Sequence, residues 1–90
     1  PNPFTPLSPD EDFNRVVFPA RTLEEASGEF TVLIFDIDGM LVKSLTALPG
    51  ETELIWDGHD ESGEIVESGV YVYQLQVGES FKTGTLIVAK

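Results

Sequence analysis

The sequence predicts an all-β protein, an antiparallel β-sandwich of about seven strands. Apolar residues alternate along several short segments, and clusters of turn residues separate them. Parallel strands would need long crossover connections, usually helical, and only one short stretch of this 90-residue chain has a helical pattern. Frequent turns between short strands are typical of antiparallel sandwiches.

The segment 29–37 has the strongest strand signal. Phe30, Val32 and Ile34 share one face, and apolar residues on the other face indicate a strand that is covered on both sides. Strands are expected at 14–20, 29–37, 40–46, 52–56, 70–77 and 81–89, with a short seventh segment at 64–67.

Turn residues mark the connections. Asp38-Gly39 predicts a hairpin with a type I′ turn, in which both central residues have positive φ. Gly78-Glu79-Ser80 predicts a tight connection between the last two strands. A capping box from Thr22 to Glu25, followed by Gly28, predicts one or two helical turns.

The chain is expected to form a single domain over residues 1–90, because a chain of this length has room for only one core. Residues 1–12 should be an extended, proline-rich entry segment, since proline cannot donate to a sheet ladder. We expect Phe4 and Leu7 to attach it to the body. Because the chain opens with Pro1, we expect it to be part of a longer polypeptide.

Composition excludes several classes of protein. The net charge is -11 with five Lys and Arg residues, which argues against nucleic acid and anionic membranes as partners. The absence of cysteine excludes disulfides and thiolate metal sites. No apolar run reaches the roughly 18 residues of a transmembrane segment. The acidity leaves cations as candidate ligands.

The stretch Asp36-Ile37-Asp38-Gly39 after an apolar strand resembles the first motif of haloacid-dehalogenase-type phosphohydrolases. In that family the first Asp is the nucleophile and the second is the acid/base. The chemistry also needs further residues on separate βα units, which a 90-residue chain with one short helix cannot build. We therefore favour a structural role for Asp36 and assign Asp38 to the hairpin turn.

Two acidic clusters are candidate cation sites. Asp10, Asp12 and Asn14 place oxygen atoms at alternate positions, as calcium loops do, but the glycine and closing glutamate of an EF-hand are missing. A solvated loop is the favoured interpretation, and no cofactor is expected apart from a possible calcium ion. The second cluster comprises Asp57, His59, Asp60, Glu61 and Glu64.

In the second cluster only His59 offers a nitrogen ligand, whereas zinc usually needs more than one His or Cys. We expect Asp57, Asp60 and Gly63 to form consecutive turns instead. Trp56 and Tyr71, with Tyr73, could form a carbohydrate platform. Aromatic residues at a period of two are more often part of a sandwich core, so we expect them to be buried.

Five motifs occur in order along the chain: Pro1-Asn2-Pro3-Phe4, a strand that ends in Phe35-Asp36, Trp56-Asp57-Gly58-His59-Asp60, Ser68-Gly69-Val70-Tyr71, and the apolar end Thr85 to Lys90. In this order they resemble the C-terminal immunoglobulin-like domain shared by flagellar hook-capping proteins and by the sorting domains of type IX secretion cargo. The resemblance implies an immunoglobulin or fibronectin III-like sandwich. Its structural signature here is Trp56, Asp57, Gly58, Asp60, Gly63, Gly69 and Tyr71.

The resemblance also implies a function. The chain is expected to be a non-catalytic C-terminal accessory domain of a larger exported protein, secreted or at the cell surface, which outer-membrane secretion machinery recognises for sorting or attachment. Leu86, Val88 and Lys90 would form an accessible terminal signal. The alternative is a scaffold that packs on other domains of the parent protein or on neighbouring subunits, as in a hook cap.

Overall fold

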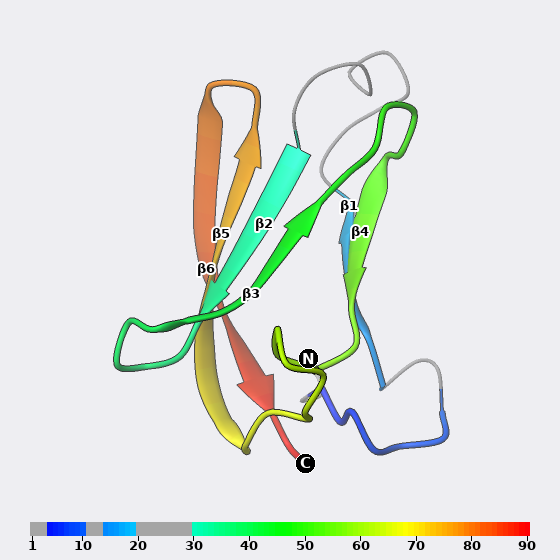
Figure 1. The fold of residues 1–90 in the computed structure, drawn as a ribbon, viewed down its shortest axis with the longest axis vertical. Helices are drawn as coiled ribbons and strands as arrows, with labels where there is room; N and C mark the ends of the chain where they lie inside the picture. The colour runs from blue at the N-terminus through cyan, green and yellow to red at the C-terminus, as the bar shows by residue number, and fades with distance from the viewer. Residues whose placement is uncertain (1–3, 11–13, 20–29) are drawn as a thin grey trace.

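The computed structural model describes residues 4–10, 14–19 and 30–90. Six strands form two sheets, a two-stranded sheet of order β1-β4 and a four-stranded sheet of order β3-β2-β5-β6 (Figure 1). All neighbouring strands are antiparallel, which confirms the predicted sandwich. The strands are β1 (Val16–Pro19), β2 (Phe30–Phe35), β3 (Leu41–Thr46), β4 (Glu53–Trp56), β5 (Gly69–Val77) and β6 (Ser80–Val88).

The seventh strand expected at 64–67 is wrong. Within the described residues, this segment contributes only an isolated bridge between His59 and Ile65. Its backbone instead makes hydrogen bonds within the loop, where the Val66 amide donates to the Gly58 carbonyl at 2.9 Å. The helix expected at 22–27 lies outside the described residues. No described helix is long and apolar enough to span a membrane.

The core lies between the two sheets, and alternate residues of the strands fill it. Strand β2 buries every second residue, Phe30, Val32 and Ile34, each with 0% exposure. Tyr71 of β5 is buried as expected, and Tyr73, Leu75 and Val77 are partly buried and pack against the core. The buried hydrophobic residues are Phe4, Phe18, Phe30, Val32, Ile34, Leu54, Trp56, Val66, Tyr71 and Val88.

The β2–β3 hairpin forms as expected, but its predicted turn type is wrong. Gly39 has a φ of 86°, whereas no described non-glycine residue has positive φ, so Asp38 does not take the type I′ conformation. The Gly39 amide donates to the Asp36 carbonyl and the Asp36 amide to the Met40 carbonyl. This is a three-residue loop in which glycine takes the left-handed conformation. Asp38 therefore does not need a strained positive φ.

The β5–β6 hairpin has the tight connection that the sequence predicts. Val77 pairs with Ser80, so Gly78 and Glu79 are the two loop residues. Gly78 has a φ of 60°, as the first central position of a type II′ turn requires.

The entry segment is attached by Phe4. The Phe4 amide donates to the Ile87 carbonyl, and the Ala89 amide donates to the Phe4 carbonyl. The Phe4 ring lies 5.4 Å from the Trp56 ring between centroids, inside the core. Leu7 is 60% exposed, so its expected attachment is wrong.

Candidate functional site

Two aspartates close the same kind of turn at one end of the sandwich. Oδ1 of Asp36 accepts hydrogen bonds from the amides of Asp38 and Met40, both at 2.9 Å. Oδ1 of Asp60 accepts from the amides two and four residues ahead, at 2.9 and 3.0 Å. In each turn a glycine three residues after the aspartate has positive φ, Gly39 in one and Gly63 in the other.

The repeated pattern is Asp-x-x-Gly-x, Asp36 to Met40 and Asp60 to Glu64. It explains why the sequence of the first turn looks like a catalytic motif. Strand β2 delivers Asp36 to a hairpin between antiparallel neighbours, and not to the end of a parallel sheet. The arrangement agrees with the structural role expected for Asp36.

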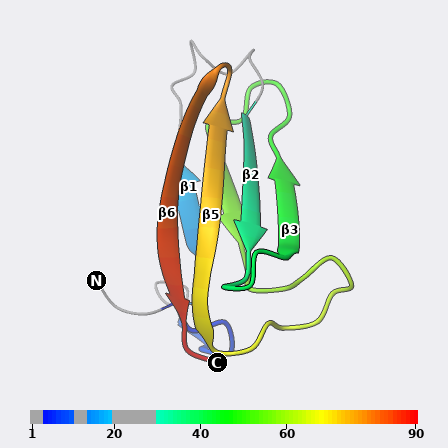
Figure 2. The ribbon, with the colours of Figure 1, turned by 90° about the vertical axis from the view of Figure 1, so that its left-hand side faces the viewer.

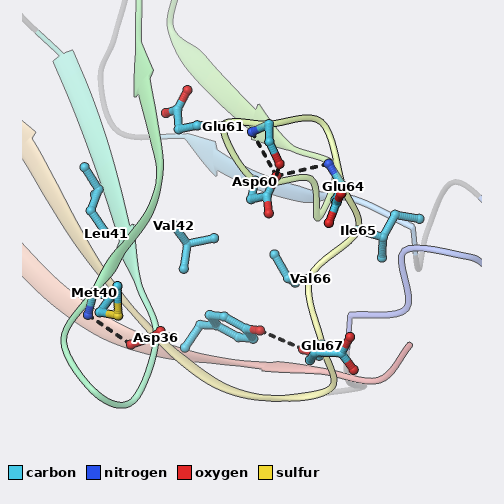
Figure 3. Close-up of a pocket in the computed structure, with 12 residues that line it drawn as sticks. Asp36, Met40, Leu41, Val42, Asp60, Glu61, Glu64, Ile65, Val66 and Glu67 are labelled. Atoms are coloured by element: carbon cyan, nitrogen blue, oxygen red, sulfur yellow. Dashed lines mark hydrogen bonds between the residues drawn. The ribbon is translucent and has the colours of Figure 1, made fainter.

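A pocket of about 470 Å³ lies between these two turns (Figure 3). Val42 and Val66 contribute apolar lining, and Tyr71 contributes its ring. The complete lining is Asp36, Met40, Leu41, Val42, Asp60, Glu61, Ser62, Glu64, Ile65, Val66, Glu67 and Tyr71. The pocket therefore combines apolar side chains with five carboxylates.

Several of these carboxylates are engaged by the protein itself. Glu61 accepts a hydrogen bond from the Ser44 amide at 2.7 Å and lies 3.9 Å from Nζ of Lys43, which joins the β4–β5 loop to β3. Oε1 of Glu67 lies 3.4 Å from Nζ of Lys90. The described residues contain no group of three metal-ligating side chains placed to hold one ion. These contacts give the carboxylates a structural use.

The pKa values of two aspartates in these loops are lowered, as expected where an ionised carboxylate accepts the hydrogen bonds of a turn. Hydrogen bonds from the Ser62 hydroxyl and the Glu64 amide lower the pKa of Asp60 below its ordinary value. Partial burial acts to raise the pKa of Asp57, but hydrogen bonds and the charge of His59 lower it overall. Desolvation, together with the negative charges of Asp36 and Glu67, raises the pKa of Tyr71.

The signature residues around Trp56 come together as one structural unit. Trp56 is fully buried, and its Nε1 donates to the His59 carbonyl at 2.9 Å. The amide and Nδ1 of His59 each lie 3.1 Å from Oδ1 of Asp57, which turns the chain directly after the indole. This burial excludes Trp56 as an exposed carbohydrate platform.

Gly58 is required for close packing at this turn. It has a φ of 85°, and an added Cβ would lie 2.6 Å from Cγ of Pro6 and 3.0 Å from Cζ of Phe4. Further along, Gly69 has a φ of 154° at the start of β5, and the Tyr71 hydroxyl donates to the Glu67 carbonyl at 2.7 Å. The entry segment and the signature residues thus stabilise the same end of the sandwich.

The expected sorting residues do not form an accessible terminal tip. Val88 is 2% exposed and belongs to the core, and Leu86 packs against that core. Only Lys90 is exposed, and its amide donates to Oγ of Ser68 at 2.9 Å. The expectation of a free end is wrong because β6 closes the sandwich and its last residues pair with Phe4.

The calcium candidate is described in part. Asp12 lies outside the described residues. The Asn14 amide donates to the Asp10 carbonyl at 3.0 Å, and Oδ1 of Asn14 accepts from Nε of Arg15 at 3.2 Å. A cation at that oxygen would lie beside a guanidinium group, which disfavours a site there. The calcium site stays a prediction.

Sequence reasoning missed two features. The contact of Glu61 with Ser44 joins residues 17 apart and has no local signal. The second feature is the outward face of the four-stranded sheet, whose residues are spread over four strands. The alternation of side chains between the two sides of a strand, applied to 70–77 and 81–89, would have predicted the part of this face that β5 and β6 contribute.

Comparisons with known proteins agree with this architecture. The chain matches PorZ, described as an essential bacterial surface component of the type-IX secretion system of the human oral bacterium Porphyromonas gingivalis, with a TM-score of 0.55 and 24% identity over 93% of this chain. This match spans 12% of the PorZ chain, and at that identity it shows a shared fold. No curated protein matches significantly. The model of the FlgD Ig-like domain matches residues 18–80, and the chain therefore belongs to the FlgD Ig-like domain family.

Proposed function

We propose that this chain is a non-catalytic accessory domain that directs a larger exported protein to the cell surface or the medium through outer-membrane secretion machinery. Its membership of the FlgD Ig-like family supports an accessory role, and the fold that it shares with part of a type IX surface component supports the export context. The single observation that carries the proposal is the compact β5–β6 end, closed by Phe4, which gives a machine a folded surface to recognise.

The non-catalytic part of the proposal rests on the use of the carboxylates. Asp36 and Asp60 each accept hydrogen bonds from two backbone amides, and the Tyr71 hydroxyl donates to a carbonyl, so these three polar groups of the pocket stabilise loops. A general acid or base must instead reach a proton of the substrate.

A reporter fusion tests this function. A fluorescent protein that is targeted to the periplasm of a bacterium with a type IX system is joined to the N-terminus of the chain. We expect the fusion to reach the cell surface or medium, while the reporter without the chain remains in the periplasm. A fusion that stays in the periplasm, although it is intact and folded, would contradict sorting and favour the scaffold alternative.

A further inference from the structure

The outer face of the four-stranded sheet carries no charged side chain. The register places Thr31, Leu33 and Phe35 of β2 on this face, because their neighbours Phe30, Val32 and Ile34 point into the core. The same alternation gives the rest of the face, Leu41, Ser44, Thr46, Val70, Val72, Gln74, Gln76, Phe81, Thr83, Thr85 and Ile87. In a chain with 16 acidic residues, an uncharged face of four strands is a distinct feature.

Apolar residues gather at one end of this face, where β6 ends and β5 begins. Val70 pairs with Ile87, and Phe35 pairs with both Val72 and Leu41, so all four strands contribute an apolar side chain at this end, with Thr85 opposite Val72 on β6. Ile87 is 61% exposed and Leu41 is 52% exposed. We call this group of side chains the apolar band and define it as Leu33, Phe35, Leu41, Val70, Val72 and Ile87.

Four of the six side chains of the apolar band are exposed, and those of Leu33 and Phe35 are half-buried. Figure 2 looks onto the outer face, where β6, β5, β2 and β3 lie in front and β1 lies behind them. Four strands about 4.8 Å apart give a band roughly 15 to 20 Å long. Hydroxyl and amide side chains such as Gln74 and Thr83 continue the face beyond it. An apolar centre, a neutral polar surround and few charges are the usual anatomy of a protein interface.

The sheet edges favour contact with the face over the addition of a strand. Lys43 on edge strand β3 and Lys82 on edge strand β6 stand opposite Ile34 and Leu75, on the inner side of the sheet. Inward-pointing lysines at edges are a common protection against pairing with another strand.

We infer that the apolar band is the surface through which the domain binds its partner in the export machinery, a protein surface with an apolar centre and a net positive surround. The face itself is uncharged, and the charge that argues for this occupant lies beyond its end, where exposed Asp38 follows β2 and exposed Glu67 precedes β5. A second copy would bring another charge of -11 to the contact and be repelled, whereas basic residues around the partner's apolar centre would be attracted. This inference rests on the proposed function.

The test uses the reporter fusion with two matched variants. Ile87→Lys puts a charge in the apolar band, and Thr83→Lys puts the same charge on the same face and strand, outside the band. Both positions are exposed, so both variants should fold, which circular dichroism and melting temperature verify. We expect Ile87→Lys to lower the exported reporter by at least about tenfold, because the charge would be desolvated in the contact. Thr83→Lys should be exported like the unchanged fusion.

Each other outcome contradicts the inference in a different way. Normal export of a folded Ile87→Lys fusion would overturn the band as the docking surface and leave the sorting function intact. Equal loss in both variants would show that the band has no special role. Retention of the unchanged fusion would remove the sorting function and the inference with it. If the isolated chain sediments as a dimer that Ile87→Lys dissociates, the occupant is a second copy.

Discussion

Asp36 and Asp60 each close a five-residue turn through one carboxylate oxygen and a glycine with positive φ. The sequence around Asp36 resembles that of a catalytic nucleophile, but in the structure its carboxylate accepts hydrogen bonds from backbone amides. Neither turn needs the carboxylate to reach a substrate. A glycine three residues after the aspartate is the sequence signal that favours a turn over a catalytic nucleophile.

Replacement of Asp36 should destabilise the hairpin. Asp36→Ala removes the acceptor of two amides and should lower the free energy of unfolding by about 1 to 2 kcal/mol. Asp36→Asn keeps one oxygen and should cost less. Urea denaturation measures both. A phosphomonoester hydrolysis that depends on magnesium and disappears in Asp36→Asn would contradict the structural role.

Trp56 should be among the most sensitive single positions. It is fully buried and makes ring contacts with Phe4 and Tyr71, so Trp56→Ala should cost on the order of 3 to 5 kcal/mol. Trp56→Phe keeps an aromatic ring but loses the hydrogen bond to His59, and it should cost less. Thermal unfolding measures the difference. An unchanged melting temperature in Trp56→Ala would contradict the core described above.

At the scale of elements, alternation predicted the strands and their buried faces, except that β2 was expected to be covered on both sides, whereas Leu33 and Phe35 on its outer face are only half-buried. Each strand is found within a few residues of its expected range, because one buried face fixes the alternation of side chains. The strand predicted at 64–67 is absent because this segment forms a loop, in which Val66 belongs to the core and Ile65 is half-buried. The prediction of a free end at β6 is wrong because the end of β6 pairs with Phe4. These residues lie at opposite ends of the sequence, so no local pattern indicates their contact.

Strand β6 also contains a position where only glycine fits. Gly84 lies opposite Tyr73, and an added Cβ would lie 2.6 Å from Cε2 of that ring. The Tyr73 ring in turn packs against Phe18 of β1, with centroids 5.2 Å apart. The contact couples the edge strand to the second sheet.

Truncation of β6 should damage folding. Deletion of Val88 to Lys90 removes a core side chain and the hydrogen bond from Ala89 to Phe4, and it should lower the free energy of unfolding by about 2 kcal/mol or more. Lys90→Ala is the control. It removes only an exposed ion pair and should change stability by less than about 0.5 kcal/mol. Equal melting temperatures for the truncated and complete chains would contradict the closing role of β6.

For the whole molecule, acidity should govern the response to pH. The pKa of Asp60 is lower in the folded than in the unfolded protein, so its contribution to stability is present above the unfolded value of 3.8 and is lost as pH falls through the folded value. Below about pH 4, the wild type should therefore lose more stability than Asp60→Asn, which cannot titrate. Parallel pH profiles for the two proteins would contradict the hydrogen-bonding role of that carboxylate.

The net charge of -11 should also make the fold more stable in salt, because screening reduces repulsion between like charges. Millimolar calcium should raise the melting temperature no more than magnesium at equal ionic strength. A larger effect of calcium that Asp10→Asn abolishes would instead establish the candidate site at Asp10, Asp12 and Asn14.

Removal of the domain tests its role in export most directly. On the proposed function, the larger exported protein that contains this chain is expressed in its native host with and without residues 1–90, because a shorter deletion at Val88 would confuse folding with recognition. The account predicts that the shortened protein stays folded, as its own activity or protease resistance shows, but remains inside the cell envelope. If the shortened protein reaches the surface or the medium at the normal level, the sorting role is contradicted.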